Sequence, residues 1–331
     1  MHFSNHHEVP KVRDMSVHTS ASQEPTDLLT AIGDPAAAPL QIPTGEETRD
    51  RRTLPLAVLT MLGTGTSSQV GAALGAHAFG VIGPAGVVAV RQLVAAVVLL
   101  PIARPPLHRF SWRQWWPTLL LGLVFAVMNL SLYIAVDHLG LGLAVTLEVL
   151  GPLAVALGGS RTRLDAVCAL GAGAGVVVLV LPGPTSDYLG VGFGLLAGAC
   201  WAAYILLNRL VGTRLPGLQA PAAAAFVSVL CYLPVIVVLG VQGRFTAAAV
   251  GYAACAGLLC SVVPYTMDMI MLRRVPAQFF GVFMSVNPVL AALAGIVILD
   301  EVLNLREWAG IAIVIAANAI ATTATSRRST R

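Results

Sequence analysis

Charged residues are scarce in this sequence. Only 11% of its 331 residues are charged and 56% are hydrophobic, whereas roughly 25% of a typical soluble domain is charged. So little polar surface cannot cover a water-soluble fold of this length, and the mean hydropathy of +0.80 agrees with that reasoning. The composition therefore excludes an ordinary soluble protein and predicts a chain whose solvent is mostly lipid.

Motifs that define several other classes are also absent. The chain has no GxxxxGK[ST] phosphate loop, no HExxH pair and no Gly-x-Ser-x-Gly elbow, which argues against an ATP-driven motor and an intramembrane hydrolase. Its five cysteines lie in apolar runs without CxxC or metal-ligand spacing, as small buried apolar residues do. We expect no enzyme activity, no cofactor and no metal site.

The first 52 residues differ from the rest of the chain. They are polar, contain eight of the sixteen acidic residues, and lack the apolar run of a signal peptide. We interpret 1–52 as a disordered cytoplasmic tail, and 326–331 as a short cytoplasmic tail at the other end.

Long apolar runs fill the remainder of the sequence. A helix needs about 20 mostly apolar residues to cross a bilayer, and ten segments meet this requirement. They are 54–74, 84–102, 115–136, 140–158, 164–182, 189–208, 219–240, 247–271, 277–299 and 306–324. The predicted fold class is an all-α integral membrane protein with ten transmembrane helices.

The distribution of arginine tests this count. With the N-terminus placed in the cytoplasm, fifteen arginines fall in inside segments and two, Arg244 and Arg306, in outside loops. Cytoplasmic loops of membrane proteins carry such an excess of basic residues, so the excess of basic residues does not indicate nucleic-acid binding. Arginine outnumbers lysine nineteen to one, which suggests a GC-rich coding sequence. We predict a multi-pass protein of a bacterial inner membrane, with both termini cytoplasmic and lipids around it.

Two similar segments suggest an internal repeat. "GPLAVAL" (151–157) and "NPVLAAL" (287–293) are offset by 136 residues, which aligns the fourth predicted span with the ninth. A repeat of five helices inverts its second copy in the membrane, as in many secondary transporters. The predicted repeats are 53–182 and 183–325. Chance likeness of two apolar helices containing proline is the alternative.

The aligned prolines carry a structural expectation. A proline removes a backbone hydrogen bond, and lipid tolerates this only where protein or a wet cavity satisfies the freed group. We therefore expect helix breaks at Gly151–Pro152 and at Pro288, facing a shared central cavity.

Three ionisable residues, Arg91, Glu148 and Asp268, lie well within predicted spans. Such residues are costly unless they face the protein interior. At a rise of 1.5 Å per residue, Arg91 lies roughly 10 Å and Glu148 roughly 12 Å from the outer surface, so the two can pair. Either they form a structural ion pair, or Glu148 binds a proton or an ammonium group while Arg91 tunes it or binds a carboxylate.

Asp268 lies near the inner end of its span, shortly before Arg273 and Arg274. It either extends to the membrane surface or serves as an inner relay for cations or protons. Uncharged polar and aromatic residues inside other spans either line a pocket for a small solute or simply pack. These are Asn129, Tyr133, Trp201, Tyr204 and Asn287.

Three stretches resemble a known family. They are "LGLAVTLEVLGPLAVAL", "GLLAGACWAAYILLNRLVG" and "FMSVNPVLAALAGIVILDEVLNLREWAGIAIVIAANA". Over roughly 54–325 the chain resembles the EamA family of the drug/metabolite transporter superfamily, and within it the threonine/homoserine exporter type. The resemblance implies ten helices in two inverted repeats and efflux driven by the proton gradient.

The resemblance also implies roles for particular residues. The acidic position of the family's fourth span corresponds to Glu148, and the polar-aromatic pair of its sixth span to Trp201 and Tyr204. Where the exporter type often has Ser-x-Glu-Pro in its ninth span, this chain has Asn287 before Pro288. Asparagine cannot carry a proton, so Glu148 becomes the expected coupling group.

These observations predict a proton-coupled exporter of small amino acids or related metabolites. A drug or toxic-cation efflux pump of the same superfamily is the main alternative, and a non-transporting membrane protein is the other. The expected partners are a small-molecule substrate, protons and membrane lipids, and a homodimer is left open.

Overall fold

The computed structural model describes residues 53–158, 163–180, 187–215, 218–264, 267 and 277–329. The predicted tail 1–52, residues 330–331 of the predicted C-terminal tail, and the candidate Asp268 lie outside these residues. Within the described ranges the secondary structure is helical throughout, with no strand. The all-α part of the predicted fold class is therefore confirmed.

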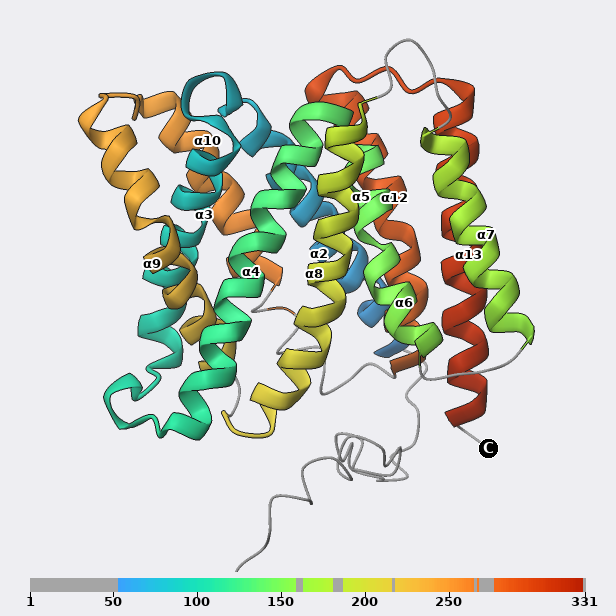
Figure 1. The fold of residues 1–331 in the computed structure, drawn as a ribbon, viewed down its shortest axis with the longest axis horizontal. Helices are drawn as coiled ribbons and strands as arrows, with labels where there is room; N and C mark the ends of the chain where they lie inside the picture. The colour runs from blue at the N-terminus through green and yellow to red at the C-terminus, as the bar shows by residue number, and fades with distance from the viewer. Residues whose placement is uncertain are drawn as a thin grey trace, which may run out of the picture. The chain divides into compact units, whose positions relative to one another are not determined.

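The helices of the first half follow the predicted spans closely (Figure 1). They are α2 (Thr53–Ala76), α3 (Phe79–Ala103), α4 (Trp112–Leu139), α5 (Leu141–Glu148), α6 (Leu150–Gly158) and α7 (Arg163–Val180), with a short 3₁₀ turn, η1 (Leu107–Arg109), before α4. One predicted span, 140–158, is thus divided between α5 and α6.

The second half repeats this pattern of long helices. It contains α8 (Tyr188–Gly212), α9 (Gln219–Val241), α10 (Ala247–Gly257), the π-helical turn η2 (Leu258–Val262), α12 (Ala277–Leu299) and α13 (Leu305–Ser329). By length and composition α3, α4, α8 and α9 can each cross a membrane. Four shorter apolar stretches are also present, Leu141–Val155, Ala166–Leu179, Ala247–Val262 and Ser285–Leu299.

Local sequence explains where several helices begin. Ser111 and Gln114 form a capping box at the start of α4, and the Thr246 hydroxyl accepts a hydrogen bond from the Ala249 amide at the start of α10. Such side chains satisfy backbone N–H groups that have no partner within the helix. Between α4 and α5 the chain turns at Gly140, whose φ of 83° favours glycine.

Small residues let the helices approach one another. α4 packs against α8 and α9, α3 against α9, and α7 against α13, the last pair lying side by side at one edge of Figure 1. A Cβ added to Gly122 of α4 would lie 2.5 Å from the Val227 Cβ of α9. Small residues allow this close backbone packing between membrane helices.

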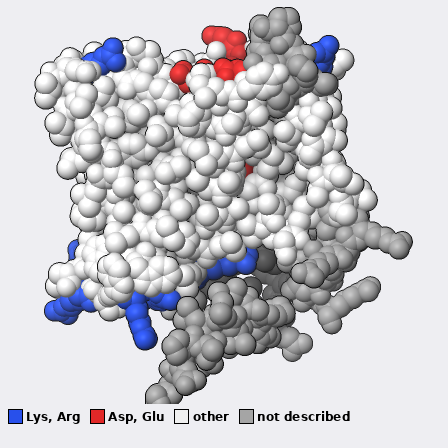
Figure 2. Space-filling model, viewed as in Figure 1, with Lys and Arg blue, Asp and Glu red and all other residues white. Residues whose placement is uncertain are grey.

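Charge is segregated between the two ends of the helices. Figure 2 shows acidic side chains at one end and most of the arginines at the other. Asp137 lies in the last turn of α4, Asp187 directly before α8, and Asp300 and Glu301 directly after α12, while Arg104 directly follows α3 and Arg209 lies in the last turn of α8. The middle is almost free of charge, as a lipid environment requires.

Candidate functional site

The interruption between α5 and α6 places Glu148 at the end of a short helix. α5 ends at Glu148 and α6 begins at Leu150. Pro152 lacks the N–H that would otherwise donate to the Glu148 carbonyl four residues earlier. Hydrogen bonds from Val149 to Val145 (3.0 Å) and from Leu153 to Val149 (3.3 Å) continue on either side. The chain therefore stays compact while one backbone carbonyl loses its helical partner.

α8 lies directly against this interruption. A Cβ added to Gly194 would lie 2.6 Å from Leu147 Cδ1, and one added to Gly198 would lie 3.0 Å from the Leu147 carbonyl oxygen. From the other side, a Cβ on Gly151 would lie only 2.0 Å from the Gly198 carbonyl oxygen. Glycine at these positions permits a contact that no other residue could make without moving a helix.

The Glu148 side chain is buried, with 7% of its surface exposed. Within the described part of the chain, no ion pair of 4 Å or less joins Glu148 to Arg91. The direct Arg91–Glu148 pair that the sequence allowed is therefore not formed in this structure, because Arg91 is engaged with residues of other helices.

Arg91 of α3 lies in a cluster with residues of α4 and η2. Its Nε donates to Ser261 Oγ at 3.3 Å, and its guanidinium carbon lies 5.5 Å from the centre of the Tyr133 ring. Tyr133 also contacts Phe79 edge to face, with ring centres 5.6 Å apart. A guanidinium over an aromatic face is an attractive cation–π arrangement. The structure thus brings together two predicted site residues, Arg91 and Tyr133.

The π-helical turn η2 places Ser261 beside Arg91. Two serines of α2 bind this turn: Ser67 Oγ donates to the Leu259 carbonyl at 3.0 Å, and the Ser68 carbonyl accepts from Cys260 Sγ at 3.0 Å. π-helical turns leave irregular backbone groups and are frequent at functional sites. Ser261 could not be singled out from the sequence, because one serine in an apolar run gives no signal of a π-turn.

The Tyr133 hydroxyl provides a test of this cluster. It is buried beside Arg91 and Cys260, but it forms no hydrogen bond of ordinary length with a described residue, which is unfavourable for a polar group. We expect Tyr133→Phe to leave the free energy of unfolding unchanged or to raise it by up to about 1–2 kcal/mol. The melting temperature should then equal or exceed that of wild type. A thermal melt of the purified variant measures this. A marked fall in melting temperature would show that the hydroxyl does bind a protein group.

Other predicted residues are more dispersed. Asn129 donates to the Phe125 carbonyl of its own helix at 2.7 Å and is 2% exposed. Tyr204 stacks on Phe125, with ring centres 5.9 Å apart, in a cluster of apolar side chains. Trp201 packs against the apolar cluster that contains Val145 and Val149. The structure therefore brings Trp201 near the Glu148 segment, whereas Tyr204 and Asn129 make packing contacts.

The ninth predicted span differs from expectation at its proline. Asn287 and Pro288 are buried, but α12 continues through Pro288 as a single helix from Ala277 to Leu299. The helix break predicted there is therefore not present. A proline within a membrane helix need not end it when neighbouring groups satisfy the freed carbonyl.

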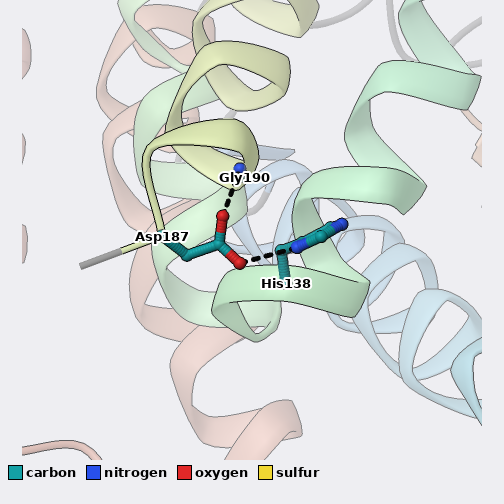
Figure 3. A network of polar contacts seen from close by, with 3 residues as sticks. All are labelled: His138, Asp187 and Gly190. Carbon is teal, nitrogen blue, oxygen red and sulfur yellow. Dashed lines mark hydrogen bonds and ion pairs between the residues drawn. The ribbon is translucent and has the colours of Figure 1, made fainter. Parts of the chain in front are cut away.

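At the acidic end, α4 and α8 are joined by a contact between His138 and Asp187 (Figure 3). The two side chains meet at 2.6 Å between His138 Nδ1 and Asp187 Oδ2. Asp187 also caps α8 by accepting from the Gly190 amide at 3.0 Å. The Gly190 N–H, followed by the His138 ring, holds the pKa of Asp187 below its ordinary value of 3.8.

This lowered pKa predicts a pH dependence of stability. A depressed carboxyl pKa contributes stability above the unfolded value of 3.8, which is lost as the pH falls through the lower folded value. Asp187→Ala is therefore expected to melt below the wild type at neutral pH, and the gap should close in strong acid. Asp187→Asn keeps a capping oxygen and should melt in between. A gap that stays constant over the whole range would contradict this.

The apolar helices, the segregated charges and the buried polar groups at helix irregularities define a multi-pass membrane protein of the transporter class. Residues 188–323 match the EamA-like transporter family. The threonine/homoserine exporter RhtA of Salmonella typhimurium is 33% identical over 276 residues, covering 82% of this chain and 93% of that protein. RhtA of Escherichia coli K12 is 32% identical over 266 residues, covering 80% and 90%.

The chain belongs to the EamA-like transporter family. A solved crystal structure is similar in fold, with a TM-score of 0.53 and 19% identity, and the match covers 84% of this chain and 99% of that one. The predicted family and the predicted transporter class are thus confirmed, as is a multi-pass bacterial membrane protein.

Proposed function

We propose that this protein exports small amino acids, of the size of threonine and homoserine, in exchange for protons across the bacterial inner membrane. The observation that carries the proposal is Glu148, a buried carboxylate at the end of α5 where the helix is interrupted. Ionisable residues inside membrane-spanning segments face the protein interior and commonly mark proton or substrate pathways. A buried carboxylate at a helix interruption is placed as such a group would be.

Arg91 gives the proposed site its second charge. Its guanidinium contacts Ser261 and Tyr133 but forms no ion pair with Glu148 in this structure. An amino acid carries both a carboxylate and an ammonium group, and guanidinium is well matched to carboxylate. We propose that Arg91 receives the substrate carboxylate and that Glu148 receives the ammonium group or the proton. The names of the RhtA relatives support amino acids as the substrate class.

The helix contacts support a pair of inverted repeats. Numbered as predicted spans, α2 to α7 form spans one to five, with α5 and α6 as the fourth, and α8 to α13 form spans six to ten. Exchanging the two halves replaces each helix by its counterpart five spans away, so that α4 corresponds to α10, α5 to α12 and α8 to α2. The contact of α4 with α8 then corresponds to that of α10 with α2, and the contact of α5 with α8 to that of α12 with α2. The contact of α4 with α9 likewise corresponds to that of α10 with α3. An arrangement of two like halves predicts this correspondence.

The charge distribution supports an orientation. The arginine-rich end shown in Figure 2 is proposed to face the cytoplasm, and the acidic end the outside. Both termini then lie in the cytoplasm. Transport would follow from rocking of one five-helix half against the other around the α5–α6 interruption.

The test is counterflow in proteoliposomes containing the full chain. Labelled threonine, homoserine and other small amino acids are supplied with and without an imposed pH gradient, beside a lipophilic cation. Uptake of amino acids that rises with the gradient is expected. Flux of the cation alone would replace the proposal with drug efflux, and absence of flux for either would favour a membrane protein that does not transport.

A further inference from the structure

Glu301, between α12 and α13, reaches the beginning of α5. Its Oε1 accepts a hydrogen bond from the Leu141 amide at 2.7 Å, and the Gly142 amide also faces the carboxylate. Its own amide donates to the Gly295 carbonyl of α12 at 3.1 Å. The carboxylate therefore caps a helix that lies 160 residues earlier in the chain, satisfying amides that have no partner within α5.

Two glycines make room for this side chain. A Cβ added to Gly295 would lie 2.2 Å from Glu301 Oε2, and one added to Gly140 would lie 2.9 Å from the Glu301 carboxyl carbon. Gly140 also has the positive φ that turns the chain from α4 into α5. The sequence thus provides a fitted recess for one carboxylate at this end of α5.

The pKa of the Glu301 carboxyl lies above its ordinary value, and the amides at the start of α5 offset part of that rise. Burial causes the rise in pKa, and the offsetting amides are those of Leu141 and Gly142. Negative charge at a helix N-terminus is favourable because it meets the positive end of the helix dipole. Oε2 has no hydrogen-bond partner in the described structure, so a neutral amide in its place removes no protein contact.

α5 is short, and both of its ends are held by the second half of the chain. Its eight residues span about 12 Å. Glu301 caps the N-terminal end, and Gly194 and Gly198 of α8 lie in close contact with Leu147 and Glu148 at the C-terminal end. Along its length α5 packs against α12, with Gly142 beside Ala292. α5 is therefore held by the α12–α13 connection at its beginning, by α8 at its end and by α12 along its side.

We propose that Glu301 is a positioning residue. By capping α5 it fixes the depth and direction of the Glu148 side chain. A residue of the second repeat thus positions the buried carboxylate of the first repeat. This inference rests on the proposed function for its transport consequence, but the cap itself is independent of what the protein transports. When the two halves rock around the α5–α6 interruption, this cap makes α5 the one part of the first half that moves with the second.

The experiment compares Glu301→Ala, Glu301→Gln and Asp300→Asn in the full-length protein. Asp300→Asn is the matched control, because Asp300 is the adjacent exposed acid, and asparagine tolerates its positive φ of 55°. Hydrogen–deuterium exchange of the peptide containing Leu141 and Gly142 is measured first. Glu301→Ala should speed exchange of these amides by about tenfold, whereas Glu301→Gln and the control should stay within about twofold of wild type.

Counterflow of labelled threonine gives the second measurement. Glu301→Ala should lower its initial rate by about tenfold or more, and Glu301→Gln should restore at least half of it. Unchanged exchange in Glu301→Ala would overturn the cap, whatever the transport result. Faster exchange with unchanged threonine flux would overturn the positioning role. If wild type carries no amino acid, the proposed function fails, and the exchange measurement alone then decides whether the cap exists.

Discussion

Replacing Glu148 with glutamine is expected to abolish transport driven by a pH gradient while leaving the protein folded in the membrane. Glutamine has nearly the same shape but cannot bind and release a proton. Glu148 is buried, and no described residue forms an ion pair with it, so the substitution leaves no opposite charge stranded at short range. Gradient-driven uptake should fall to the level of protein-free liposomes.

The control for this result is Asp137→Asn, which removes an exposed acid from the end of α4. It should transport as wild type does. Exchange of labelled for unlabelled substrate, measured without a gradient, separates coupling from binding, and Glu148→Gln is expected to retain part of it. Full gradient-driven uptake by Glu148→Gln would remove this residue from the coupling mechanism.

The second large effect is expected from Gly151→Ala. The added methyl group would lie 2.0 Å from the Gly198 carbonyl oxygen, far inside van der Waals contact, so α6 and α8 must separate. Forcing extra atoms into a packed interface costs about 1–3 kcal/mol or more. We expect a clear loss of thermal stability and of folded yield in detergent.

Gly158→Ala is the matched control in the same helix. No atom lies within 4 Å of a Cβ added there, and alanine favours a helix over glycine, so its melting temperature should equal or exceed that of wild type. Equal melting temperatures for Gly151→Ala and wild type would mean that the close contact between the interruption and α8 is absent in the folded protein.

Local pattern predicted the helices well. The apolar runs placed the helices, and residues such as Ser111 and Thr246 begin them through caps that act over three residues. Pro152 and its glycine neighbour marked the region where α5 gives way to α6. These features depend on neighbours in the chain, so the sequence contains their cause. Pro288 shows the limit, because whether a proline interrupts a helix depends on what surrounds it.

Contacts between distant segments could not be predicted from the sequence. Glu301 follows an apolar helix as an ordinary loop acid would, and only the fold places it at the Leu141 amide. Arg91 looked like a partner for Glu148 because their depths match, yet it bonds Ser261, 170 residues away. Depth along a helix follows from counting residues, whereas the direction of a side chain depends on how helices pack.

Proton movement driven by substrate is the measurement that tests the central claim most directly. Proteoliposomes containing the wild-type protein and an internal pH-sensitive dye receive threonine on one side, with no pH gradient at the start. We expect a pH change inside the vesicles that is absent in Glu148→Gln and in protein-free liposomes. Threonine flux without any movement of protons, in wild type, would contradict proton coupling and the role given to Glu148.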